Sequence, residues 1–109
     1  MEVIWSKLSI DSVDSIITYV ERHFGNKTAA KVYRKIISFL LSLSHTPRMG
    51  TVMPQFSQFG EIRRAVFKQN HIYYRIMDSQ IELIIIWDGR QDPSRLYDML
   101  IDYLTKNYE

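Results

Sequence analysis

The segment Ile62–Arg90, IRRAVFKQNHIYYRIMDSQIELIIIWDGR, decides the fold of this chain. It holds three runs rich in β-branched and aromatic residues, and each run is short enough to be a strand. Polar residues separate the runs: Gln69-Asn70 lies between the first and second, and Asp78–Gln80 between the second and third. Short polar breaks between such runs are typical of β-hairpins, so the segment predicts a three-stranded antiparallel meander.

The second and third runs indicate where the core lies. Successive side chains of a strand point to opposite faces. One face of the second strand would carry Ile72, Tyr74 and Ile76, and the other would carry His71, Tyr73 and Arg75. The third run is nearly continuous in apolar residues, which predicts a central strand with Ile84 and Ile86 buried under helices. We expect the rest of the chain to cover one face of this meander and to leave the other face open.

Length and composition bound the class of protein. A chain of 109 residues with 46% hydrophobic and 24% charged residues is expected to form one soluble globular domain, residues 1–109. It has no cysteine, which excludes disulfides, thiolate metal sites and a cysteine nucleophile. The net charge of +2 is small, so any role in nucleic-acid binding must depend on where the basic residues lie.

Targeting signals are not apparent in the sequence. No apolar run approaches the length of a membrane span, and the first residues lack the basic-then-apolar order of a signal peptide. We therefore expect a cytoplasmic protein that does not act at a membrane.

The residues before the meander predict a strand and a helix. Glu2–Trp5 is a short apolar run and predicts an edge strand. Ser6 follows it and can cap a helix with its hydroxyl. Apolar residues then recur at helical spacing over Lys7–Phe24, and Gly25 is suited to end that helix.

A second helix should begin at Asn26 or Thr28 and end before Pro47, because the residue preceding a proline is driven out of the α region. The short link to the first helix predicts an antiparallel helical hairpin with a wide apolar stripe. The following segment, Arg48–Gly60, has no clear periodicity, and we expect a loop with a short strand near Val52.

A last helix completes the prediction. Asp92 can cap it, Pro93 suits its first position, and its apolar stripe extends to about Asn107. The order is strand, helix, helix, three-strand meander, helix. This order predicts an α+β fold in which a helical hairpin packs on one face of a mostly antiparallel sheet.

Several short motifs, spread over almost the whole chain, resemble one family. They are Trp5-Ser6, Ile16 with Tyr19, Ala30 with Ile36, Pro47–Gly50, Ile62–Arg64, Tyr74–Ile76 and Trp87–Pro93. In this order and spacing they resemble toxins of the RelE/ParE superfamily, from bacterial type II toxin–antitoxin systems. The resemblance implies a compact toxin that a cognate antitoxin protein neutralises, with no cofactor.

The resemblance leaves the target of the toxin open. RelE-like members cleave messenger RNA in the ribosomal A site, whereas ParE-like members poison DNA gyrase. The chain is therefore expected to be either a metal-independent endoribonuclease acting on ribosome-bound mRNA or a non-enzymatic gyrase poison. A binding module without toxicity is a third alternative. We favour the ribonuclease slightly at this point.

The ribonuclease alternative implies a set of site residues. The superfamily's catalytic positions fall at Arg63, His71, Arg90 and Tyr97, which we expect on one open surface. Lys68 and Arg75 would add positive charge near the substrate, and Tyr73 a stacking surface. Cleavage by the ribose 2′-hydroxyl needs a proton acceptor and cations near the phosphate. Only His71 among these has an ordinary pKa, about 6.5, suited to proton transfer near neutrality.

Each of these residues also has an ordinary structural explanation. An exposed histidine beside a turn is usually only solvated, and Arg90 could pair with Asp88 or Asp92. Tyr97 could be a packing residue on the flank of the last helix.

The depleted set of basic residues and the modest net charge favour the gyrase alternative. Arg63 and Arg64 are adjacent, so only one can point to the open face, and the other would lie over the helices. Ala65 stands where the ribonuclease subtype has a second basic residue.

Overall fold

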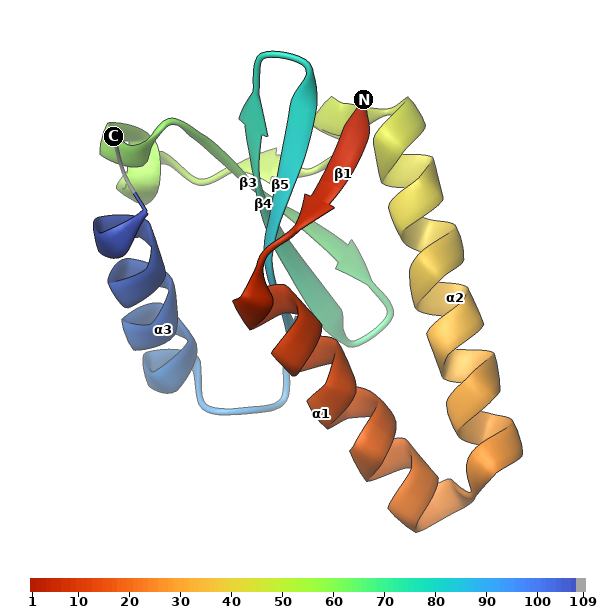
Figure 1. Cartoon of the computed structure of the whole chain (residues 1–109). Helices are drawn as coiled ribbons and strands as arrows, with labels where there is room; N and C mark the ends of the chain where they lie inside the picture. The colour runs from red at the N-terminus through yellow and green to blue at the C-terminus, as the bar shows by residue number, and fades with distance from the viewer. Residues whose placement is uncertain (108–109) are drawn as a thin grey trace.

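The computed structural model describes residues 1–107 as a five-stranded sheet between two helical layers (Figure 1). The elements in chain order are β1 (Glu2–Trp5), α1 (Lys7–Phe24), α2 (Asn26–His45), the 3₁₀ turn η1 (Pro47–Met49), β2 (Thr51–Val52), the 3₁₀ turn η2 (Pro54–Phe59), β3 (Glu61–Phe67), β4 (Asn70–Met77), β5 (Gln80–Asp88) and α3 (Pro93–Lys106). The predicted α+β order is confirmed. The short strand expected near Val52 is also present, as β2.

The sheet has the order β1-β5-β4-β3-β2. β1 pairs in parallel with β5, and all other pairs are antiparallel, as the predicted meander requires. The two hairpin turns lie at Lys68–Gln69 and Asp78–Ser79, and the first is one residue earlier than the sequence suggested. Lys68 and Asp78 both have positive φ, 56° and 40°, which these tight turns require.

The helical hairpin α1–α2 covers one face of the sheet. Its buried side chains Val13, Ile36, Leu40 and Leu43 pack against residues of all three long strands, among them Ile72 and Ile86. Ser6 fixes the start of α1, as predicted. Its hydroxyl accepts from the backbone N–H of Ser9 at 3.0 Å and donates to the carbonyl of Ile84 at 2.9 Å. The cap therefore joins the helix directly to β5.

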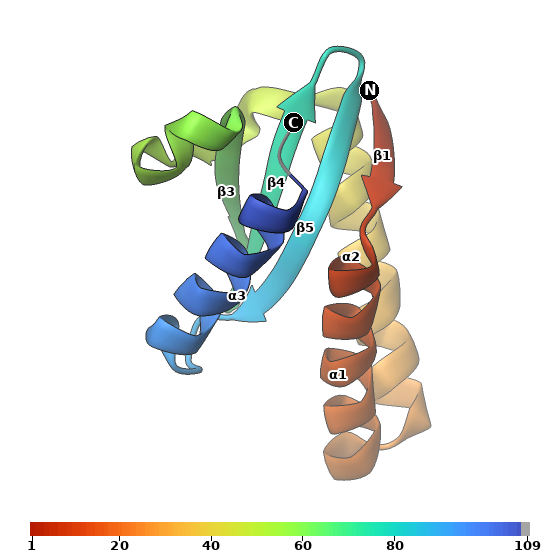
Figure 2. The ribbon, with the colours of Figure 1, turned by 60° about the vertical axis from the view of Figure 1, so that its left-hand side comes forward.

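The opposite face is covered by α3, as Figure 2 shows, so the prediction of an open face is wrong. Leu96, Leu100 and Leu104 of α3 pack against Tyr73 and Trp87 of the sheet. The apolar stripe of α3 needs a surface to bury against, and the hairpin already occupies the other face. The sheet is therefore a central layer with a separate core on each side.

A β-bulge lets β5 contribute to both cores. Tyr73 pairs with Ile85 and Tyr74 pairs with Leu83, so Ile84 is an extra residue on β5. Ile84 and Ile85 consequently both lie in the core under α3, and alternation resumes with Ile86 under the hairpin. The predicted burial of Ile84 and Ile86 is confirmed, but the two residues lie on opposite faces.

A buried ion pair attaches α3 and η2 to the sheet. Arg75 is 6% exposed, and its guanidinium donates to Glu82 at 2.7 Å and to the carbonyls of Phe59 at 2.9 Å and Asn107 at 3.3 Å. The hydroxyl of Tyr103 donates to the other carboxylate oxygen of Glu82. Because each charged group is matched, the burial of this pair is tolerated.

The burial of β5 can be tested with Ile84→Asp. This change places an unpaired carboxylate in the core under α3, so the free energy of unfolding should fall by roughly 4 kcal/mol or more. Urea denaturation followed by circular dichroism measures it. Val66→Asp on β3 is the matched control, because Val66 is 52% exposed and its change should cost no more than about 0.5 kcal/mol. A normally stable Ile84→Asp protein would show that the strand is placed wrongly.

The Tyr103 hydroxyl should make stability depend on alkaline pH. Burial, together with the hydrogen bond to Glu82, raises the pKa of Tyr103 from 10.0 to about 12. Between these pH values the folded state keeps a proton that the unfolded state loses, so the free energy of unfolding should decrease as the pH rises. Urea denaturation at a series of alkaline pH values measures this. Tyr103→Phe should remove part of the decrease, whereas Tyr33→Phe on the exposed side of α2 should not.

Candidate functional site

The two adjacent arginines of β3 point to opposite faces of the sheet. Arg63 lies on the hairpin side, where its Nε donates to Glu61 at 2.7 Å and its Nη1 to the carbonyl of Gly50 at 2.7 Å. Arg64 lies on the α3 side with Val66, which pairs with His71. The expectation that Arg63 shares a surface with His71 is therefore wrong, and Arg64 takes that place.

The sequence did contain a signal for this arrangement. Residues directly opposite each other in an antiparallel pair project to the same face. A two-residue turn between β3 and β4 puts Arg64 and Val66 on the face of His71. This holds whether the turn is at Lys68-Gln69 or at Gln69-Asn70. The superfamily pattern pointed to Arg63 instead, and the strand geometry is the better guide.

The α3 face carries two buried donors without a partner. Within residues 1–107, the Nε of Arg64 and the Nε1 of Trp87 are buried and make no hydrogen bond. Trp87 pairs with His71 across β4 and β5, and Arg64 is close enough to influence the charge of His71. Buried N–H groups normally have acceptors. Arg64, His71 and Trp87 therefore form a candidate site for an acceptor group, which we call the β-face triad.

The pKa of His71 is lowered in this site. Burial is the main cause that lowers its pKa, the positive charge of Arg64 lowers it further, and Asp88 partly opposes both. The backbone of Gly89 lies against the imidazole, since a Cβ at that position would be 2.6 Å from Nε2. The Gly89 N–H donates to the carbonyl of Gln69 at 2.7 Å, which holds the loop in place. The ring can accept a hydrogen bond or a proton, but it is a weaker base than a solvated histidine.

Arg90 forms an ion pair with Asp88, one of the two partners considered for it from the sequence. Its Nε and Nη2 donate to the two carboxylate oxygens of Asp88 at 3.0 and 2.6 Å, and its backbone N–H donates to Asp88 at 2.9 Å. This pairing holds the pKa of Asp88 below its usual range. The Arg90 side chain is still 70% exposed, so its remaining N–H groups face solvent. The loop after β5 thus presents a guanidinium whose position is fixed.

The other proposed site residues fall in three different environments. Tyr97 is 50% exposed and leans on Phe56, with ring centroids 5.7 Å apart. Tyr73 is buried under α3 and Arg75 is held by Glu82, so neither presents its side chain to a substrate as predicted. Lys68 lies on the β3–β4 turn beside α2. The predicted set is therefore not assembled on one surface.

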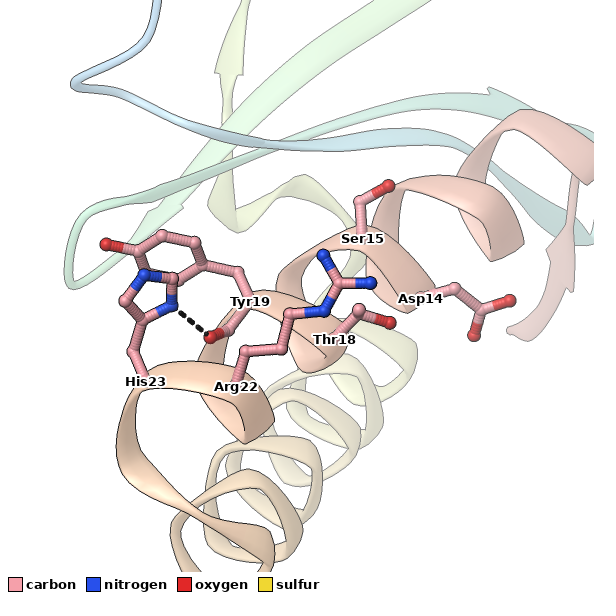
Figure 3. Close-up of a pocket in the computed structure, with 6 residues that line it drawn as sticks. All are labelled: Asp14, Ser15, Thr18, Tyr19, Arg22 and His23. Atoms are coloured by element: carbon pink, nitrogen blue, oxygen red, sulfur yellow. Dashed lines mark hydrogen bonds between the residues drawn. The ribbon is translucent and has the colours of Figure 1, made fainter.

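A shallow hollow of about 360 Å³ lies on α1 (Figure 3). Its lining residues all come from this helix and are Asp14, Ser15, Thr18, Tyr19, Arg22 and His23. Tyr19 and His23 are stacked with centroids 4.2 Å apart, and the imidazole Nδ1 lies 2.9 Å from the carbonyl of Tyr19. Tyr19 is near enough to Arg90 to influence its pKa. The hollow therefore adjoins the loop after β5, but its open shape offers no enclosed binding site.

Two further features of residues 1–107 concern the class of protein. None of the helices there combines the length and apolar character needed to cross a bilayer. No three histidine, aspartate or glutamate side chains of this part of the chain come together as metal ligands.

The placement of Arg64 beside His71 can be tested by NMR titration. Arg64→Gln removes a positive charge that lowers the pKa of His71, so this pKa should rise toward its ordinary value of 6.5. Arg63→Gln removes the same charge on the other face and should leave the His71 pKa unchanged. The imidazole C–H resonances of the three proteins measure it. An equal shift in both variants would contradict the assignment of the two faces.

Comparison with known proteins identifies the family. Residues 3–93 match the family model described as ParE toxin of type II toxin-antitoxin system, parDE. A similar solved structure is the chromosomal ParDE TA system from P. aeruginosa, with a TM-score of 0.66 and 17% identity over 79% of this chain and 92% of that chain. At this identity the similarity shows the fold alone. No curated protein sequence matches the chain. Because the family model covers most of its length, the chain belongs to the ParE toxin family of type II toxin–antitoxin systems.

Proposed function

We propose that this toxin inhibits growth by binding and poisoning DNA gyrase, without cleaving RNA. The observation that carries the proposal is the ParE family match over residues 3–93, because toxins of this family typically poison gyrase. A poison of this kind needs a binding surface but no group that breaks a bond. The other part of the function follows from the family itself, since a type II toxin is paired with a cognate antitoxin.

The geometry of the predicted catalytic set supports this choice over the ribonuclease. Arg63 is engaged with Glu61 on the hairpin face, and Arg75 is engaged with Glu82 inside the protein. Among the predicted site residues His71 is the only candidate base, and its pKa is lowered first by burial and then by the positive charge of Arg64. A weaker base and a depleted set of cations fit poorly with cleavage of a phosphodiester, which needs both.

One observation favours the ribonuclease as a second candidate. The buried donors of Arg64 and Trp87 lack acceptors within residues 1–107, and they flank His71. A phosphate oxygen would be a suitable acceptor for such a donor, and Arg90 lies in the loop directly after β5. On this alternative, mRNA bound to the ribosome is the substrate and the β-face triad replaces the set that the superfamily pattern predicted.

The antitoxin has an apolar surface available to it on the hairpin. Tyr33, Ile37 and Leu41 lie one helical turn apart on α2 and are 47%, 38% and 61% exposed. An amphipathic segment of the antitoxin could cover this stripe and remove it from water. We expect the antitoxin to bind there, whichever target the toxin has.

Two purified systems separate the two candidate functions. In the first, the toxin is added to gyrase and supercoiled plasmid with ATP, and we expect cleaved plasmid to accumulate. In the second, the toxin is added to ribosomes carrying a defined mRNA, and we expect no new mRNA 5′ ends. Plasmid cleavage that requires gyrase supports the proposal. Cleaved mRNA together with intact plasmid would establish the ribonuclease instead.

His71→Gln sharpens the distinction. If the toxin is a gyrase poison, this variant should arrest growth as the wild type does, because no proton transfer is needed. If the toxin is a ribonuclease, removing one positioned group should slow cleavage by on the order of 10²-fold. Growth of an inducible strain measures this, and thermal melting of the purified variant checks that it is folded. A nontoxic but folded His71→Gln protein would count against the gyrase proposal.

A further inference from the structure

Three lysines form a row along one side of α2. This helix contains no aspartate or glutamate, and Lys27, Lys31 and Lys35 follow one another at intervals of four residues. That interval places them on one side of the helix, about 6 Å apart along its axis. All three are exposed. Although the net charge of the chain is only +2, three ammonium groups form a row on this helix.

The β3–β4 turn brings a fourth lysine to the end of this row. Lys68 and Lys35 line one hollow of about 330 Å³. The other lining residues come from α2 and β3 and are Ser38, Phe39, Ser42 and Phe67. The ammonium groups of Lys35 and Lys68 are close together. The interaction with Lys68 is the main cause that lowers the pKa of Lys35, and the charge of Lys31 lowers it further. We call the hollow and the lysine row together the α2 basic surface.

The positive charge of this surface is not neutralised by the protein. Within residues 1–107, none of Lys27, Lys31, Lys35 and Lys68 takes part in an ion pair. By contrast, Lys7 pairs with Asp11 on α1, and Lys106 pairs with Asp102 on α3. Like charges placed together repel one another, and an anion bound between them would relieve the repulsion. The surface thus favours a ligand with several regularly spaced negative charges.

The aromatic rings of the hollow indicate which part of a polyanion binds. Phe39 and Phe67 stack on each other with centroids 4.9 Å apart, and Lys68 lies over the Phe67 ring at 5.8 Å from its centroid. Both phenylalanines also pack against the core. The rings are therefore occupied and do not form a platform on which unpaired bases could stack. Contacts limited to phosphates are typical of binding to a duplex without reading its sequence.

We propose that the α2 basic surface binds the phosphate backbone of duplex DNA. The choice of DNA over duplex RNA rests on the proposed function, because gyrase acts on duplex DNA. Lys35 and Lys68 hold one phosphate at the hollow, and Lys31 and Lys27 follow the same strand toward the tip of the hairpin. The surface lies on the hairpin side of the sheet, and the β-face triad lies on the opposite side.

The experiment measures the anisotropy of a fluorescent mixed-sequence DNA duplex titrated with purified toxin at several salt concentrations. We expect the double variant Lys35→Gln/Lys68→Gln to bind about tenfold more weakly at low salt. The slope of log K against log salt should decrease in magnitude by about 0.9, because the two lysines together neutralise one phosphate. Lys7→Gln/Lys106→Gln is the matched control, since it removes the same charge elsewhere and should change affinity less than about twofold.

Two further comparisons decide the assignment. Lys35→Arg/Lys68→Arg keeps the charge and should restore binding, and thermal melting should show that all the variants are folded. An equal weakening in the glutamine double variant and its control, or no binding by the wild type at low salt, would overturn the site. If an RNA of the same sequence, either single-stranded or duplex, binds more tightly than the DNA duplex, the assignment of the surface to DNA would be overturned. The assay contains neither gyrase nor ribosomes, so its outcome is independent of the outcome for the proposed function.

Discussion

The burial of β5 on both of its faces is the constraint on which the rest of the structure depends. A strand of alternating side chains normally serves one core and leaves the other face polar. β5 serves two cores, and the bulge at Ile84 changes the alternation so that two adjacent isoleucines meet α3. The hairpin and α3 can then pack on opposite sides, and the charge of Arg75, which enters the layer under α3, is matched by Glu82.

Much of the fold could be predicted because its signals are local. The alternation of β4, the cap at Ser6 and the Asp92-Pro93 helix start each depend on a few neighbouring residues. The side of the sheet on which α3 packs could not be predicted in this way. Its apolar stripe shows that it must be buried, but the choice of face depends on which face the hairpin has already covered.

The candidate site was less predictable, because the role of a charged side chain depends on its partners. Arg63, Arg75 and Arg90 look alike in sequence, yet one anchors a loop, one is buried in a matched pair and one stays exposed. Glu61 lies two residues from Arg63, and Asp88 lies two residues from Arg90. The carbonyls of Gly50 and Phe59, which Arg63 and Arg75 also bind, are distant in the chain and could not be named beforehand. The α2 basic surface was equally hard to predict, because Lys68 and Lys35 are distant in the chain and meet only in the folded protein.

The parallel pairing of β1 with β5 also determines when the toxin can acquire its shape during synthesis. Glu2 pairs with Gln80 and Trp5 with Leu83, so the first strand to leave the ribosome has no neighbour until the fifth has emerged. The α1–α2 hairpin can form early because its contacts are close in sequence, but the sheet against which it packs cannot be completed before then. A nascent toxin therefore remains unassembled until most of its chain has been translated, which leaves an interval in which an antitoxin already present can meet it as it folds.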